Sequence, residues 1–232
     1  MKTALMLIAC LGLNIAWAAP VDDFVTTWKT DNPGTSNDTS ITVPMVGGRY
    51  DVDWDNDGTF DQFNLTDSVT HDYGVVGTYT IRIAGTYNSI RFGYDAEDEE
   101  KILSIDQWGT QSWTTMLDAF YGAVNLQVPA TDVPEFSRVT SMQKMFQYAY
   151  SANPDTNGWD TSAVTDMSWM FAYAYSANPD TSGWDTSAVT DMAGMFIDAT
   201  LANPETSGWD TSAVTDMHAM FGAESANPDT SG

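Results

Sequence analysis

The sequence predicts an α/β solenoid of repeats preceded by a small all-β sandwich. The segment GWDTSAVTDM occurs three times in the 232-residue chain, starting at Gly158, Gly183 and Gly208. Before the repeats, short runs of alternating apolar and polar residues are separated by Gly, Asn and Asp. The apolar fraction of 43% is large enough to fill a core, so we expect a folded chain.

The chain begins with the pattern of a secretory signal peptide, residues 1–18. Lys2 precedes a short apolar run, and the small-x-small sequence Ala16-Trp17-Ala18 follows it. Because the run is too short to span a bilayer, we expect cleavage near Ala19 and no membrane insertion after the signal is removed. The alternative is a lipoprotein signal in which Cys10 is acylated.

Residues 19–100 have the pattern of a β-sandwich. The runs ITVPMV, RYDVDW and TYTIRIAG are short and bounded by turn residues, as expected of antiparallel strands. The acidic run from Asp95 to Glu100 predicts a solvated boundary before the repeats.

Residues 101–232 contain about five repeat units with a period of 25 residues, the first two degenerate and the last incomplete. The segment Trp159 to Val164 predicts a short strand. A short helix is predicted by the apolar spacing i, i+3, i+4 and i+7 of Met167, Met170, Phe171 and Ala174. One such unit cannot bury its apolar face alone, so we expect the units to stack. Stacking should form four interior ladders: Trp159/Trp184/Trp209, Val164/Val189/Val214, Met167/Met192/Met217 and Phe171/Phe196/Phe221.

The unit WDTSAVTDMSWMFAYAYSANPDTSG resembles those of the BspA-like leucine-rich repeat surface proteins of bacteria, which share W-D-T-S-x-V-T-D-M-x-x-M-F-x-x-A. This resemblance implies a leucine-rich-repeat-like solenoid on a secreted or cell-surface protein, often discussed as an adhesin, and it carries no catalytic residues. The chain departs from many relatives in having Ala163, Ala188 and Ala213 where those relatives have Asn.

The N-terminal part resembles PKD-like domains. The similarity rests on the turn from Asp53 to Gly58, on His71-Asp72-Tyr73 and on the segment Gly77 to Ile81. It implies an immunoglobulin-like spacer domain in which His71 is a fold residue.

Charge and residue counts exclude several classes of function. The formal net charge of −24 repels the phosphates of nucleic acids and anionic lipid headgroups. With one Cys and two His, the chain lacks the ligands for a structural zinc site, a disulfide framework or a Cys/His catalytic pair.

The strongest candidate site in the sequence is a group of four aspartates: Asp53, Asp55, Asp57 and Asp61. The spacing D-x-D-x-D-G matches the first half of a calcium loop, because alternate residues of a tight turn can direct carboxylates to one centre. The twelfth position is Asn64 instead of a bidentate Glu. Calcium is therefore one interpretation, and an acidic hairpin turn that bonds its own amides is the other.

Two further sets of side chains recur with the repeat. Asp160/Asp185/Asp210 and Asp166/Asp191/Asp216 form rows that either cap local turns or bind cations. The pairs Tyr148/Tyr173 and Tyr150/Tyr175 predict short ladders that would form either a binding surface or loop packing.

The favoured function is a non-enzymatic secreted or cell-surface binding protein, with an extracellular protein or glycan as its partner. One alternative is a glycan-cleaving enzyme that uses paired Asp residues. Another is ice binding through Thr161/Thr186/Thr211, although these threonines do not form a T-x-T strand.

Overall fold

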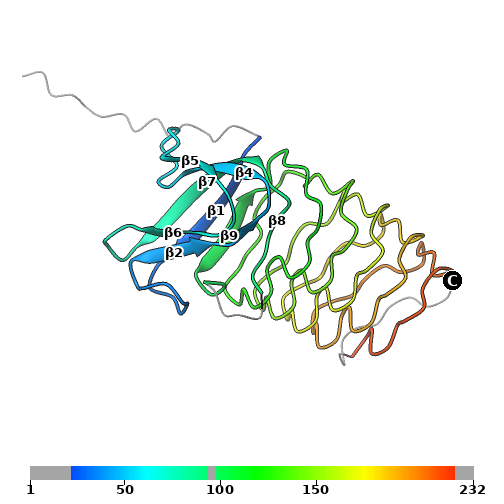
Figure 1. Ribbon diagram of the computed structural model, residues 1–232. Helices are drawn as coiled ribbons and strands as arrows, with labels where there is room; N and C mark the ends of the chain where they lie inside the picture. The colour runs from blue at the N-terminus through cyan, green and yellow to red at the C-terminus, as the bar shows by residue number, and fades with distance from the viewer. Residues whose placement is uncertain (1–21, 94–97, 223–232) are drawn as a thin grey trace, which may run out of the picture.

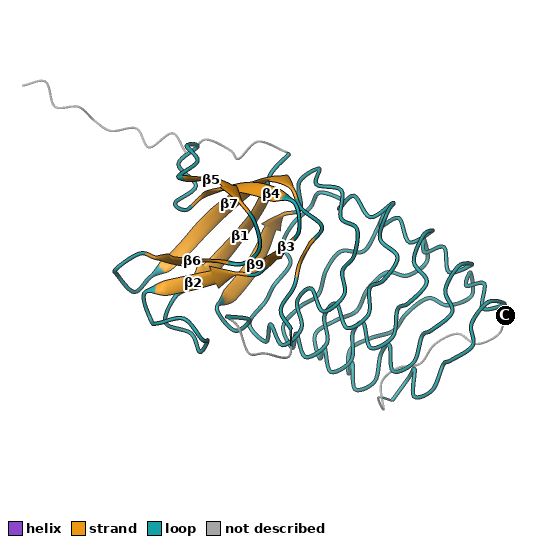
Figure 2. Ribbon diagram, viewed as in Figure 1, coloured by secondary structure: helices purple, strands orange, loops and turns teal. Residues whose placement is uncertain are grey.

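The computed structural model describes residues 22–93 and 98–222, which form strands and turns without any helix (Figure 2). The signal peptide at residues 1–18, Cys10 and Ala19 lie outside the described residues, as do residues 95–97 of the acidic run. Within the described part of the chain, no helix is long and apolar enough to cross a membrane.

A five-stranded antiparallel sheet forms the N-terminal part of the molecule (Figure 1). Its strand order is β5-β4-β7-β1-β9. The strands are β1 (Phe24–Lys29), β4 (Arg49–Asp53), β5 (Gln62–Leu65), β7 (Thr78–Thr86) and β9 (Ile102–Gln107). Alternate residues of β1 face the core, where Phe24 and Trp28 are fully buried.

Two small sheets accompany the large one. One pairs β2 (Ser40–Val43) with β6 (Val69–Asp72), and the other pairs β3 (Met45–Val46) with β8 (Ser89–Ile90). The three runs expected to be strands are strands in the structure, because ITVPMV forms β2 and β3, RYDVDW forms β4, and TYTIRIAG forms β7.

The repeats continue directly from the edge strand β9. The amide of Ile105 donates to the carbonyl of Gln127 at 3.0 Å, and the amide of Gln127 donates to Leu103 at 2.8 Å. Trp108 packs against both parts, with its ring centroid 6.1 Å from that of Phe24 and 5.8 Å from that of Phe136. One apolar core therefore runs from the sheet into the repeats.

The repeat units lie one behind the other (Figure 1), and parallel bridges join Ser141 to Asp166, Asp166 to Asp191, and Asp191 to Asp216. Burial confirms the expected interior ladders in the units that contain Trp159 and Trp184, whose ladder residues are at most 5% exposed. Rings of successive units stack with centroids 5.5 Å apart for Phe146 and Phe171, and 5.7 Å apart for Phe171 and Phe196. The last described unit is less well covered, since its Met217 is 42% exposed.

The helix predicted over Met167–Ala174 is wrong. The amides of Met167, Trp169, Phe171 and Tyr173 donate to carbonyls of the next unit at 2.8–2.9 Å, whereas those of Met170, Ala172 and Ala174 donate three residues back. An α-helix would need every amide to bond four residues back. Trp169 and Tyr173 also have positive φ, 60° and 59°, which breaks a right-handed helix.

The short strand predicted over Trp159 to Val164 is also wrong, because this segment forms turns in which Trp159 donates to Thr156 and Val164 donates to Thr161. The α/β leucine-rich-repeat-like solenoid behind a small immunoglobulin/PKD-like sandwich is therefore not the fold of this chain. The described residues are all-β, and the three sheets belong to the N-terminal part and do not form a solenoid.

Candidate functional site

The acidic turn connects β4 to β5. Asp53 ends β4 and is fully buried, while Asp55, Asp57 and Asp61 are exposed. One carboxylate oxygen from each of Asp53, Asp55 and Asp61 lies within 4.8 Å of the other two. The structure thus brings together three of the four predicted ligands. The fourth, Asp57, directs Oδ1 to the amide of Thr59 at 2.8 Å.

Backbone amides of the turn also bind these carboxylates. Asp53 accepts from the amides of Asp57 at 3.2 Å and Gly58 at 2.9 Å, and Asp61 accepts from Trp54 at 2.8 Å. Gly58 has φ 97°, which a glycine adopts without strain. The local bonds expected of an acidic hairpin turn are therefore present, and they aim the three carboxylates at a common point.

Arg82 is a neighbour of the acidic turn that the sequence analysis missed. Its Nη2 lies 3.1 Å from Oδ2 of Asp53, and its Nε lies 3.2 Å from Oδ2 of Asp23. The guanidinium is also 4.8 Å from the ring centre of Phe60, which closes over it from the turn. The sequence signal was a lone arginine inside the apolar strand TYTIRIAG, at the position that pairs with Asp53 across β4 and β7.

Unlike Asp53, Asp55 forms no ion pair with a basic side chain among the described residues. Burial raises the pKa of its carboxyl group, and the negative charge of Asp57 raises that pKa further. A cation at the common point would oppose both effects, because it favours the ionised form.

His71 packs between aromatic rings beside the turn. It stacks on Trp54 with centroids 4.5 Å apart and meets the edge of Tyr73 at 4.4 Å. Burial lowers the pKa of His71. This packing accords with the expectation that His71 is a fold residue.

The predicted tyrosine ladders are formed. The rings of Tyr148 and Tyr173 stack with centroids 4.9 Å apart, and those of Tyr150 and Tyr175 also stack at 4.9 Å. Tyr150 and Tyr175 are 39% and 42% exposed. Stacking covers one face of each ring within a pair.

A comparison with known protein families shows to which family the chain belongs. Residues 91–178 and 114–232 match the family described as Mycoplasma protein of unknown function, DUF285, and together they cover more than half of the chain. The chain belongs to the DUF285 family. No curated protein and no solved structure matches it.

The DUF285 match covers β9 and all the repeats, so the family unit includes the junction with the sheet. It supports the coarser part of the resemblance, a bacterial repeat protein. The leucine-rich-repeat and PKD-like assignments are not confirmed by the comparisons.

The aspartates of the DUF285 repeats bond to their own turns. Asp160 accepts from the amide and hydroxyl of Ser162 at 3.1 and 2.6 Å, and Asp185 accepts in the same way from Ser187 at 3.0 and 2.6 Å. Asp191 accepts from the amide of Ala193 at 2.9 Å. These bonds agree with the capping interpretation of the two Asp rows.

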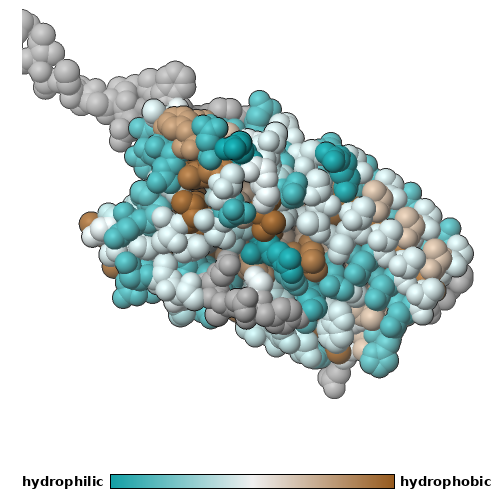
Figure 3. Space-filling model, viewed as in Figure 1, coloured by the Kyte–Doolittle hydropathy of each residue, from teal (hydrophilic) through white to brown (hydrophobic). Residues whose placement is uncertain are grey.

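Two of the three threonines at one position of the DUF285 unit, Thr161 and Thr186, are internal, whereas Thr211 is exposed. Thr161 and Thr186 are 1% exposed, and their hydroxyls donate to the carbonyls of Asp185 and Asp210 at 3.0 and 3.1 Å. Thr161 and Thr186 therefore do not contribute to an exposed threonine surface of the kind that ice binding would require. On the face in Figure 3, hydrophilic residues cover much of the surface, and small apolar spots recur along the repeats.

Proposed function

We propose that this chain is a non-enzymatic, secreted or surface-attached binding protein whose stacked repeats present a recognition face to an extracellular protein or glycan. The observation that supports this proposal is the regular surface of the stack. Equivalent side chains recur at a fixed spacing, and the exposed column of Tyr150 and Tyr175 is one example. Tyrosine offers a large, rigid contact area with a hydrogen-bonding tip, which suits recognition.

The test is an array of matrix proteins and glycans probed with the purified chain and with the double variant Tyr150→Ser/Tyr175→Ser. Binding should weaken by about tenfold or more in this variant if the column belongs to the recognition face. Leu201→Ser is the matched control, because Leu201 is 62% exposed in the next unit. If the array shows no binding to any component, the proposal is wrong.

The proposal includes export, as the sequence of residues 1–18 predicts. N-terminal sequencing of exported protein should begin near Ala19. An acylated start at Cys10 would instead make the protein membrane-anchored.

We also propose calcium as a structural cofactor of the acidic turn. The support is the convergence of Asp53, Asp55 and Asp61 within 4.8 Å, since Ca²⁺ prefers several oxygen ligands from a short loop. This site would stabilise the sheet and would not take part in recognition by the repeats.

A further inference from the structure

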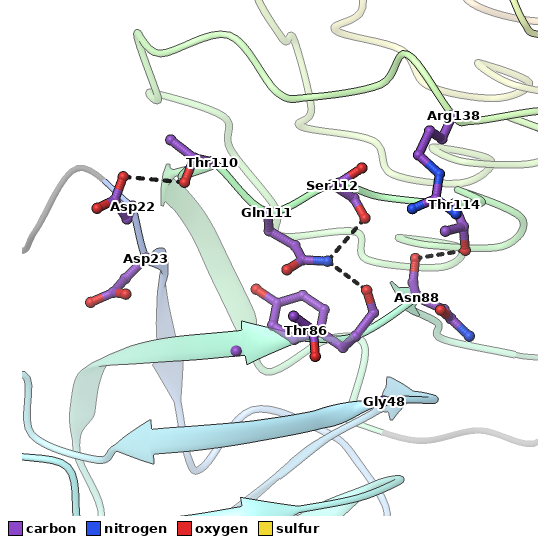
Figure 4. A pocket seen from close by; sticks show the side chains of 12 residues that line it. Asp22, Asp23, Gly48, Thr86, Asn88, Thr110, Gln111, Ser112, Thr114 and Arg138 are labelled. Carbon is purple, nitrogen blue, oxygen red and sulfur yellow. Dashed lines mark hydrogen bonds between the residues drawn. The ribbon is translucent and has the colours of Figure 1, made fainter.

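A polar pocket of about 560 Å³ lies where the sheet meets the first repeats (Figure 4). Asp22 and Asp23, at the start of the described chain, line one side. Gln111 and Ser112 line the middle, and Arg138 reaches in from the next repeat unit. The volume is in the range of sites that hold small ligands.

The walls of this junction pocket are fixed by hydrogen bonds between its two sides. The amide of Thr110 donates to the carbonyl of Asp22 at 3.2 Å, and its hydroxyl donates to Oδ1 of Asp22 at 3.2 Å. On the far side, the amide of Thr114 donates to the carbonyl of Asn88 at 3.0 Å. Gly109, with φ 70°, lets the backbones meet, because a Cβ there would lie 2.6 Å from the carbonyl oxygen of Asp22. The pocket is therefore largely preformed.

The polar groups of the pocket keep bonding capacity for a ligand. Gln111 Nε2 donates to the carbonyls of Tyr87 at 2.5 Å and Ser112 at 3.0 Å, which leaves Oε1 as an acceptor. Asp22 uses Oδ1 for Thr110, which leaves its Oδ2 for a ligand, whereas Asp23 is buried and pairs with Arg82. Arg138 is exposed and takes part in no ion pair among the described residues.

These groups match one class of ligand. The carboxylate of Asp22 and the amide oxygen of Gln111 accept hydrogen bonds on one side, while the guanidinium of Arg138 donates on the other. Sugar hydroxyls can donate and accept at the same time, so they can bond to both sides. Two carboxylates in the lining and a chain charge of −24 disfavour an anionic ligand. We propose that the junction pocket binds a neutral, hydroxyl-rich saccharide unit, a proposal that rests on the proposed role in extracellular binding.

The experiment measures binding of the full purified chain to immobilised neutral oligosaccharides of hexoses and N-acetylhexosamines, with sialylated oligosaccharides on the same array. The pocket variants are Asp22→Ala and Arg138→Ala, and both replaced residues are exposed, so the fold should be retained. Asp38→Ala, an exposed aspartate elsewhere in the sheet part, is the matched control. Unchanged melting temperatures verify the fold of all variants.

We expect binding to a neutral oligosaccharide that falls about tenfold or more in each pocket variant, the effect of losing a charge-assisted hydrogen bond. Asp38→Ala should bind as the unaltered chain does. Tyr150→Ser/Tyr175→Ser should keep its affinity for the neutral oligosaccharide held by the pocket, even where it loses ligands of the repeat face. A preference for sialylated glycans, or binding that both pocket variants retain, would overturn the pocket proposal. Glycan binding lost only in the tyrosine variant, or binding to matrix proteins alone, would overturn it while supporting the proposed function.

Discussion

The guanidinium of Arg82 lies 3.1 Å from Oδ2 of Asp53, so the acidic turn contains one built-in positive charge. A calcium ion at this turn would have to share Asp53 with that guanidinium and with the amide of Gly58, 2.9 Å from the same oxygen. The turn is thus partly neutralised before any ion binds, while the charges of Asp55 and Asp61 remain available.

Calcium should stabilise the folded chain at fixed ionic strength. An ion that binds the native state and not the unfolded state adds about 2.7 kcal/mol when its concentration is a hundredfold above the dissociation constant. The measurement is the melting temperature with and without millimolar calcium, for the unaltered chain and for Asp55→Asn/Asp57→Asn. A rise that survives the double substitution would assign the effect to the repeat carboxylates. The absence of any rise in both proteins would leave the turn a purely structural loop.

Arg82→Met should lower the free energy of unfolding by about 3–5 kcal/mol, because it leaves two poorly exposed carboxylates, Asp23 and Asp53, without their partner. Urea denaturation measures this loss. Arg138→Met, at an exposed position, is the control and should change stability by less than about 0.5 kcal/mol. Equal stability of the two variants would mean that the buried ion pairs do not hold the turn to the sheet.

Trp184→Ala should cost about 3–5 kcal/mol of unfolding free energy, since Trp184 is 5% exposed and stacks on Trp209 with centroids 6.5 Å apart. Equilibrium unfolding followed by circular dichroism gives the value. A loss below about 1 kcal/mol would show that the tryptophan ladder contributes little to the core.

Gly194→Ala should destabilise the chain by about 1–3 kcal/mol. Gly194 has φ 62°, and a Cβ there would lie 2.8 Å from the Trp169 ring of the preceding unit. Gly183→Ala is the matched control, because a Cβ at Gly183 meets nothing within 4 Å. The control should be close to neutral in the same denaturation experiment. If both variants have the same stability, the positive φ at this position of the unit is not required.

Acid should weaken the repeat turns through carboxylates such as Asp185. The hydroxyl and the amide of Ser187 donate to Asp185 and lower its pKa. A depressed pKa in the folded chain gives stability that is present above the unfolded pKa of about 3.9 and is lost as the pH falls through the folded value.

Ser187→Ala should therefore raise the pKa of Asp185 toward its ordinary value, as measured by NMR titration of the carboxyl carbons. The same variant should leave Asp180 unchanged, because Asp180 bonds to Ser182. A pKa of Asp185 that does not move would mean that the serine hydroxyl is not its donor in solution.

The sequence predicts the strand or the buried position of a residue correctly where that residue belongs to a local or periodic pattern. Alternation located β2, β3, β4 and β7, and the 25-residue period identified which side chains stack in the core. The spacing of Met167, Met170, Phe171 and Ala174 fits both a helix and a turn in which every second amide bonds to the next unit. Apolar periodicity indicates only which side chains are buried, so it cannot distinguish the helix from such a turn.

Contacts that depend on tertiary structure could not be predicted from the sequence in this way. Arg82 reaches the acidic turn only because β7 pairs with β4. Arg82 and Asp53 are far apart in the sequence, so no local pattern links them. The junction pocket joins Asp22 to Arg138 across still more of the sequence. No motif marks either relationship.

The alternating amides of the repeat have a consequence for how such proteins can evolve. The same inter-unit bond recurs from unit to unit, as when Met167 donates to Asp191 and Met192 donates to Asp216, both at 2.9 Å. A gene duplication that copies one whole unit would supply the same donors and acceptors on both of its sides. Stack length can therefore change in whole-unit steps at little cost, whereas an insertion of any other size within these turns would misalign every bond along that edge.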